Sequence, residues 1–342
     1  MTEIDRVGPL IVAEISGNHN GSLKRALDIV RAAADAGAHA VKIQTYTADT
    51  ITLDVDTPAF RISEGHELWG SRTLYNLYQE AHTPWDWHEP IFELSRDLGM
   101  KAFSSPFDET AVEFLESLEV PMYKIASMEI VDLPLITQVA ETGKPMIVSV
   151  GTASIQEVAA AVEAARKGGC TDLTLLICTS SYPALPDDAH LRRIPAVAEL
   201  FGVNVGMSDH TLGVGVSIAA TALGATVVEK HVTLSREDGG VDAAFSLEPA
   251  ELRQLVEGCE AAARALGSAD VWSTSTENES LRLRPSLYVT TDVTVGETIS
   301  PANVRSVRPA GGLPPADLDR VIGRTFRKDA AKGTPVTWDL LS

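Results

Sequence analysis

The stretch NVGMSDHTLGVGVSIAATALGATVVEKHVT, residues 204–233, contains two short apolar runs, and each run ends close to a histidine. The intervening residues 213–223 are long enough to form a helix that returns the chain between two parallel strands. His210 and His231 would then project from one edge of a sheet, the edge at which α/β barrels keep their chemistry. Two imidazoles there supply half of a metal site, although a single partly buried histidine is more often a structural residue bonded to the backbone.

The same alternation of apolar runs and helical patterns continues along the chain. Stretches such as 23–36, 110–118 and 155–167 repeat apolar residues near i, i+3, i+4 and i+7, which is typical of amphipathic helices. Eight strands alternating with helices over about 260 residues predict a (β/α)₈ TIM barrel rather than an open doubly wound sheet. No GxGxxG motif follows the first strand, which disfavours a dinucleotide-binding fold. The predicted strands cover residues 10–16, 40–46, 101–107, 123–127, 145–150, 173–180, 204–210 and 226–232.

Composition changes along the chain predict its division into domains. Residues 1–267 carry the barrel pattern, residues 268–284 form a polar linker, and residues 285–342 alternate short β-prone runs with Gly and Pro turns. A β-rich module of that size is near the lower limit for independent stability, so we expect it to pack on something. Residues 47–97 are too long for one helix and predict an insertion near the barrel mouth, either a substrate lid or a seal on the barrel's side. Its aromatic cluster consists of Trp69, Tyr75, Tyr78, Trp85 and Trp87.

Composition also limits the classes of function. The 342 residues are 44% hydrophobic and 22% charged, as in soluble globular proteins, and no apolar run approaches the roughly 20 residues that cross a bilayer. The N-terminus lacks the pattern of a signal peptide, so we expect a cytoplasmic protein without a membrane partner. The spacing of Cys170, Cys178 and Cys259 indicates buried hydrophobes rather than disulfides or zinc ligands. A net charge of −19 argues against nucleic acid, although a few convergent lysines can still attract a small anion.

Charged residues inside apolar strands are candidates for chemistry. Glu14 lies within LIVAEIS, where a carboxylate is costly unless paired or functional, so it is either a general base or the partner of a lysine. Lys42 and Gln44 share one face of the second strand, and Lys124 lies in the fourth. With serines at strand exits, the lysines offer donors that suit a phosphate or carboxylate, although each serine alone is more often a turn or capping residue. These serines are Ser104, Ser105, Ser127, Ser180 and Ser208.

Motifs in a fixed order run through nearly the whole chain. The barrel carries EISGNHNGSL, AVKIQTYTADTITLD, LYNLYQEAHTPWDWH, FSSPFDETAVEFLE, YKIASMEI, SSYP, GMSDHTLG, EKHVTL and GGVDAAFSLEP. The tail carries SLYVTTDVTVGE, VRSVRPAGGLPP and VIGRTF. Together they resemble the sialic acid synthase family, which condenses phosphoenolpyruvate with an amino sugar, and within it the branch that makes pseudaminic acid. The tail is similar to the antifreeze-like SAF module of that family, and the AHTPW and GGxDxAFSLEP segments carry the likeness to the branch.

The resemblance implies a role for each candidate residue. His210 and His231 would bind a divalent cation, commonly Mn²⁺ with Mg²⁺ or Co²⁺ as alternatives, and we assign Glu14 as the base that takes a proton from water. Leu283 and Pro285 depart from an FRRS stretch that is usual in relatives. Phosphoenolpyruvate would be held by Lys42, Ser105, Lys124, Ser127, Ser208 and Ser180, the last at a position where relatives often have Asn. The sugar would be contacted by Gln44, Glu129, Tyr182, Asp242 and Arg308, with Arg308 reaching from a partner chain in a domain-swapped homodimer.

Other interpretations stay open at this point. The sugar could be N-acetylmannosamine or a related diacetamido sugar, giving a different nonulosonic acid. Histidines at strand ends beside a carboxylate also occur in metal-dependent barrel hydrolases, although such sites usually need more metal ligands than two histidines. A carbohydrate-binding protein without catalysis would explain the aromatic residues, but it leaves Glu14 and the two strand lysines unexplained.

Overall fold

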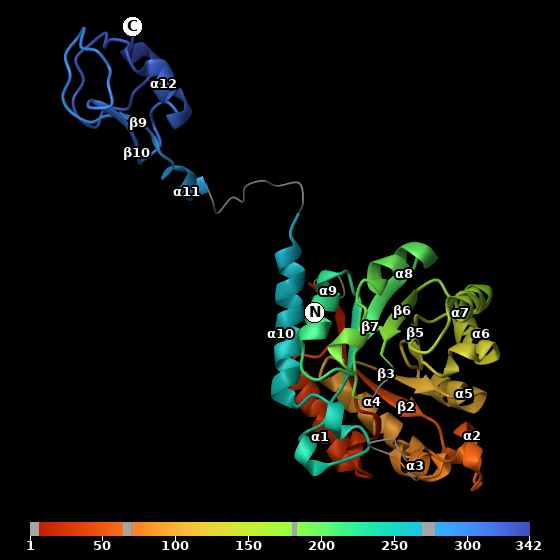
Figure 1. Ribbon diagram of the computed structural model, residues 1–342. Coiled ribbons are helices and arrows are strands. Elements are labelled where there is room, and N and C mark those ends of the chain that lie inside the picture. Colours follow the sequence, from red (N-terminus) through yellow and green to blue (C-terminus); the bar gives the residue numbers. More distant parts are fainter. Residues whose placement is uncertain (1–6, 64–69, 71, 180–182, 269–277) are drawn as a thin grey trace. The chain divides into compact units, whose positions relative to one another are not determined.

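The chain forms two compact units, which divide after Gly267. The computed structural model (Figure 1) describes residues 7–63, 70, 72–179, 183–268 and 278–342. Three residues singled out in the sequence, Trp69, Ser180 and Tyr182, lie outside the described residues.

Eight parallel strands make the first unit a closed barrel, which confirms the predicted fold class. Each strand pairs with the next one along the chain, and the eighth closes on the first with His231 opposite Glu14. Every strand lies within its predicted window. The strands are β1 (Leu10–Glu14), β2 (Ala40–Thr45), β3 (Lys101–Pro106), β4 (Tyr123–Ile125), β5 (Met146–Ser149), β6 (Leu173–Cys178), β7 (Asn204–Ser208) and β8 (Val227–His231).

Helices surround the strands (Figure 1) and bury their apolar faces against them. The side chains of Ser22, Asp108 and Ser154 accept hydrogen bonds from the first turns of α1, α5 and α7, which fixes where these helices begin. The helices of this unit are α1 (Leu23–Asp35), α2 (Ala48–Ile51), α3 (Leu74–Ala81), α4 (His88–Asp97), α5 (Glu109–Ser117), α6 (Leu133–Glu141), α7 (Ile155–Lys167), α8 (Arg193–Phe201), α9 (Gly215–Ala222) and α10 (Pro249–Leu266).

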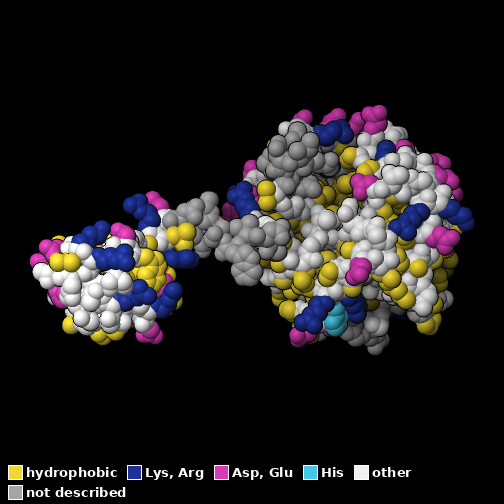
Figure 2. Space-filling model, turned by 90° about the horizontal axis from the view of Figure 1, so that it is seen from above, with side chains coloured by type: hydrophobic (Ala, Val, Ile, Leu, Met, Phe, Trp, Pro, Cys, Tyr) yellow, Lys and Arg dark blue, Asp and Glu magenta, His cyan; other side chains and the backbone are white. Residues whose placement is uncertain are grey.

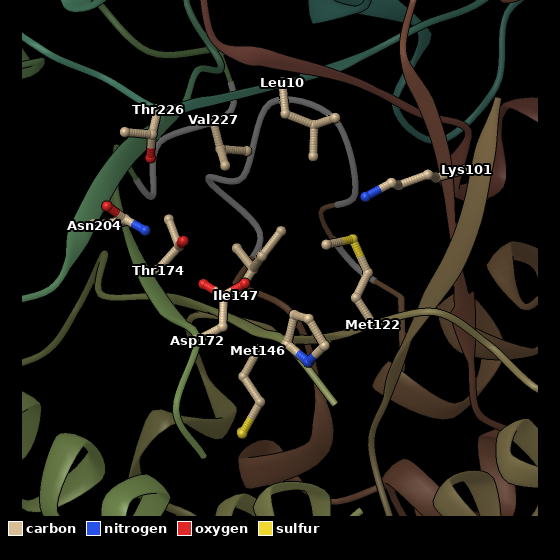
Figure 3. Close-up of a pocket in the computed structure, with 11 residues that line it drawn as sticks. Leu10, Lys101, Met122, Met146, Ile147, Asp172, Thr174, Asn204, Thr226 and Val227 are labelled. Carbon is tan, nitrogen blue, oxygen red and sulfur yellow. The ribbon is translucent and has the colours of Figure 1, made fainter. Parts of the chain in front are cut away.

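The amino end of the barrel interior is filled with apolar side chains, including Phe103, Ile147 and Leu176. A small cavity of about 130 Å³ lies at this end. Figure 3 shows the residues that line it, which lie at the starts of the strands. The cluster of buried charged side chains lies at the opposite, carboxyl end. Cys170, Cys178 and Cys259 are free and buried, as the sequence predicts.

In the described parts of the predicted insertion between β2 and β3, the helices α2 and α3 precede the barrel helix α4. Tyr78 of α3 lines a cavity at the carboxyl end of the barrel, as expected for a lid. Trp85 instead stacks on Phe114 with ring centroids 4.6 Å apart, as expected for a seal. Tyr78 thus lies at the cavity and Trp85 lies against α5, and the choice between lid and seal stays a prediction.

The second unit has its own small core around an antiparallel pair, β9 (Ser286–Val289) and β10 (Val304–Val307). Its short helices are α11 (Asn278–Leu281) and α12 (Leu318–Val321). This unit carries as many Lys and Arg as Asp and Glu, so the whole net charge of −19 belongs to the barrel unit. Figure 2 shows several Lys and Arg side chains on the visible face of the second unit. Among the described residues, no helix has the length and apolar character needed to span a membrane.

Candidate active site

Four charged side chains meet inside the barrel near the carboxyl ends of its strands. Glu14 ends β1, Lys42 and Lys124 lie in β2 and β4, Glu229 lies in β8, and none is more than 3% exposed. The Lys42 ammonium lies 2.5 Å from Oε2 of Glu14 and 3.6 Å from Oε1 of Glu229. The Lys124 ammonium lies 3.2 Å from the same Glu229 oxygen. Two cations and two anions thus compensate one another where water is largely excluded.

The two carboxylates of this cluster differ in basicity. Burial raises the pKa of Glu14, although the nearby Lys42 ammonium opposes this effect. Burial also disfavours the charged form of Glu229, but Lys124 and Lys42 outweigh it and hold the pKa of Glu229 below its ordinary value. Glu14 is therefore the better proton acceptor of the two, which is the property that a general base requires.

His210 and His231 lie side by side, with ring centroids 5.3 Å apart, which confirms that β7 and β8 bring them together. The ring of Phe245 meets both imidazoles edge to face. Nδ1 of His210 lies 2.7 Å from the carbonyl oxygen of Thr179, a contact that orients the ring and favours a proton on Nδ1.

The protonation of the two imidazoles differs. Burial lowers the pKa of His231, and the charges of His210, Lys42 and Lys124 lower it further, so this ring is neutral, the form that binds metals. Burial acts in the same direction on His210, but contacts with Cys178 and with the backbone raise its pKa overall. A cation can bind only a ring nitrogen that carries no proton, so a cation bound to His210 would displace any proton from the nitrogen to which it binds.

The two imidazoles suit a divalent cation whose other coordination positions are filled by ligands from outside the protein. Nδ1 of His231 is buried and forms no hydrogen bond within the described structure, and the nearest Asp242 oxygen is 3.8 Å away. A buried imidazole nitrogen without a partner is costly unless a ligand completes it. No group of three or more His, Cys, Asp or Glu among the described residues could hold a metal ion. The protein would therefore supply two imidazole ligands, and water and substrate would fill the remaining positions.

Two of the predicted serines bond to the charged cluster. Oγ of Ser105 accepts a hydrogen bond from Lys42 at 3.3 Å, and Oγ of Ser208 donates one to Glu229 at 3.3 Å. Ser127 is buried just after β4. The three hydroxyls thus belong to the same end of the barrel as the lysines.

A cavity of about 450 Å³ opens beside this cluster. Gln44, His231 and Asp242 line it, and the Gln44 amide donates to Glu14 at 3.3 Å and to Ser16 at 3.2 Å. Asp242 is buried in the loop after β8, and this burial raises its pKa. Gln44 therefore connects the charged cluster to the cavity. The described residues that line the cavity are Ser16, Gln44, Tyr46, Ile62, Leu74, Leu77, Tyr78, Ala81, His231, Val241 and Asp242.

Two predicted sugar contacts lie apart from this cavity lining. Glu129 follows β4, is half-buried, and has a pKa that burial raises to about 7. Arg308 lies in the second unit, where it is exposed directly after β10. Their roles stay predictions.

Glu229 is a central residue that the sequence reasoning missed. Side chains alternate along a strand, so Glu229 faces the same side of β8 as His231, and that rule alone could have identified it. The neighbouring Lys230 faces the other way and forms a fully buried ion pair with Asp209 at 3.0 Å. Its role is to join β7 and β8 outside the barrel interior.

The chain is similar to known proteins along most of its length. A model of the NeuB family matches residues 29–271, and a SAF domain model matches residues 284–342. The chain is 41% identical over 332 residues to the pseudaminic acid synthase of Helicobacter pylori, covering 97% of each chain. It is 34% identical over 335 residues to the N,N'-diacetyllegionaminic acid synthase of Legionella pneumophila, covering 96% of this chain and 93% of the other. The solved structure of an N-acetylneuraminic acid synthetase from Leptospira borgpetersenii superposes with a TM-score of 0.70 at 32% identity, covering 80% and 90% of the two chains.

A closed parallel barrel with charged and imidazole side chains gathered at its carboxyl end has the architecture of a TIM-barrel enzyme. The family model covers most of that barrel. The chain belongs to the NeuB family and carries a SAF domain at its C-terminal end.

Proposed function

We propose that the protein condenses phosphoenolpyruvate with 2,4-diacetamido-2,4,6-trideoxy-L-altrose and water, giving pseudaminic acid and phosphate. The observation that carries this proposal is the pair of buried ammonium groups of Lys42 and Lys124, on the same barrel interior as His210 and His231. Each ammonium has three N–H donors, so it can bond a phosphate or carboxylate oxygen in addition to its glutamate partner. The choice of sugar is supported by the 41% identity to a pseudaminic acid synthase, against 34% to a legionaminic acid synthase.

Phosphoenolpyruvate binds to the two lysines in this proposal, and its phosphate and carboxylate groups become their partners. Hydroxyl groups donate further hydrogen bonds to the same anion in this proposal. These are the hydroxyls of Ser105, Ser127 and Ser208, and also that of Ser180, whose assignment comes from the sequence alone. The sugar is held by Gln44, Glu129, Tyr182 and Asp242.

The methylene carbon of phosphoenolpyruvate forms the new C–C bond with the aldehyde carbon of the open-chain sugar, and positive charge develops at the enol carbon. His210 and His231 would hold a divalent cation, Mn²⁺ with Mg²⁺ or Co²⁺ as alternatives, and this cation would polarise the aldehyde oxygen when bound. Glu14 takes a proton from the water that adds at the enol carbon, while the sugar oxygen gains a proton and becomes a hydroxyl. The hydroxyl of the tetrahedral adduct then gives its proton to the leaving phosphate as the C–O bond to phosphate breaks, which leaves a nine-carbon 2-keto acid and hydrogen phosphate.

Mass spectrometry of the products tests this proposal. Phosphoenolpyruvate is mixed with the enzyme and a panel of amino sugars that includes the diacetamido trideoxyhexose and N-acetylmannosamine. We expect one phosphate for each nine-carbon keto acid, and no phosphate when the sugar is omitted. Release of phosphate without any sugar would favour the barrel hydrolase and contradict the proposal.

We further propose that two copies of the chain exchange their second units, so that Arg308 of each completes the sugar site of the other. Coexpression of Arg308→Ala and Glu14→Gln chains with different tags tests the exchange. Each variant homodimer should be weakly active, whereas the purified mixed dimer should regain activity, because one of its sites contains an intact Glu14 and an intact Arg308. A mixed dimer no more active than its parents would show that Arg308 does not act across chains.

A further inference from the structure

The cavity of about 450 Å³ at the barrel mouth has two chemically different sides. Its size is in the range of roughly 300–1,000 Å³ that holds small-molecule substrates. Ser16, Gln44, His231 and Asp242 provide a polar floor from the strand ends and the loops that follow them. All other described lining residues are apolar or aromatic, and most of them come from the insertion between β2 and β3: Tyr46, Ile62, Leu74, Leu77, Tyr78, Ala81 and Val241.

The apolar side is built mainly by one face of α3. Leu74, Leu77, Tyr78 and Ala81 follow the spacing i, i+3, i+4 and i+7, so they lie on one side of the helix. Gln79 lies on the opposite side of the same helix and is exposed. We call the four lining residues the α3 face.

Neighbouring contacts hold the α3 face in place. The Tyr78 ring meets Tyr46 edge to face with centroids 5.7 Å apart. Gly17, after β1, lets the loop after β8 approach closely, because any Cβ at this position would overlap the Val241 side chain. Ala81, at the end of α3, lies within ordinary van der Waals reach of the same position. Tyr46, directly after β2, thus supports the α3 face at Tyr78.

The orientation of a sugar in this cavity follows from its polar floor. The reacting aldehyde carbon must lie near His231 and the cluster around Glu14, since the chemistry takes place there. The opposite end of a six-carbon sugar, from C4 to C6, then extends toward the α3 face. A C6 hydroxyl placed against Leu74, Leu77 or Ala81 would lose its water without gaining a hydrogen bond, because these three side chains have no polar atom. A C6 methyl or the methyl of an acetamido group would instead bury apolar surface there.

We infer that the α3 face selects a hexose that lacks the C6 hydroxyl and carries a second acetamido group at C4. This inference rests on the proposed condensation with phosphoenolpyruvate and adds the structural reason for the sugar preference. Pockets of this kind discriminate one methyl or hydroxyl by roughly 10- to 200-fold. We therefore expect the specificity constant kcat/KM to favour the diacetamido trideoxyhexose over N-acetylmannosamine by at least about 10-fold.

Substitution of the α3 face tests the inference. Leu77→Asn keeps the branched shape of the side chain but adds an amide to the α3 face. Leu74→Gln also adds an amide, at a less buried position, and serves as the second variant if Leu77→Asn folds poorly. Gln79→Leu, on the exposed side of the same helix, is the matched control. The kcat/KM of each variant is measured with both sugars, together with the KM for phosphoenolpyruvate and the thermal unfolding midpoint.

We expect Leu77→Asn and Leu74→Gln to lower the preference for the trideoxy sugar by about 10-fold or more, through a higher KM for that sugar. The KM for phosphoenolpyruvate should match that of the wild type in all variants. The control variant should also keep the wild-type preference between the two sugars. The inference would be overturned if kcat/KM fell equally for both sugars, or if the ratio of the two kcat/KM values stayed as in the wild type. A wild-type preference for N-acetylmannosamine would also overturn it while leaving the condensation intact, whereas a wild type that condenses neither sugar would contradict the proposed function itself.

Discussion

Turnover should fall about 10²–10⁴-fold when Glu14 is replaced by glutamine, because the water that adds to the enol carbon would lose its proton acceptor. Glutamine keeps the size of the side chain and can still accept a hydrogen bond from Lys42. The dissociation constant of phosphoenolpyruvate should therefore change by a much smaller factor than kcat. Steady-state kinetics and calorimetric titration of phosphoenolpyruvate measure the two effects separately.

Glu113→Gln is a suitable control for this variant, since Glu113 is an exposed carboxylate on α5, outside the site. It should leave kcat unchanged. If Glu14→Gln folds normally and turns over at a rate close to that of the wild type, Glu14 is not the base.

Glu229→Ala should lower the free energy of unfolding by about 3–5 kcal/mol, the usual result of removing one partner from a buried ion pair. Lys124 lies 3.2 Å from Glu229, and Lys42 lies 3.6 Å from it. Without the Glu229 carboxylate, the cluster would contain two buried ammonium groups and only one carboxylate, that of Glu14. Urea denaturation measures the loss, and phosphate or phosphoenolpyruvate should restore part of it by supplying a new anion.

Glu260→Ala provides the comparison, because it removes an ion pair with Arg264 in which both side chains are more than 40% exposed. Exposed pairs contribute about 0–1 kcal/mol, so this variant should remain close to the wild type in stability. Equal stability of Glu229→Ala and the wild type would show that the cluster does not need this carboxylate.

The fold could be predicted from the sequence because strands and helices have different periods, and both periods are visible in the apolar residues. The positions of Lys42 and Gln44 followed from the same rule, since alternate residues of a strand share one face. Glu14 was expected to be either a base or a partner of a lysine, and the structure shows the pairing with Lys42.

Contacts across the barrel could not be predicted in the same way. The distance between Lys124 and Glu229 depends on how eight strands close into a ring, and these residues are 105 positions apart in the chain. The cavity lining likewise depends on the close packing of Gly17 against Val241 in the loop after β8, and local periodicity says nothing about that approach. The sequence therefore indicated which residue types gather at the mouth better than which ones touch.

The pairing of His210 and His231 around one divalent cation is tested most directly by equilibrium dialysis of the purified protein against Mn²⁺. The wild type should bind one Mn²⁺ per chain, and His210→Ala and His231→Ala should each abolish this binding while Glu14→Gln retains it. Unchanged Mn²⁺ binding in both histidine variants would contradict the site, because the two imidazoles would then have no part in holding the ion.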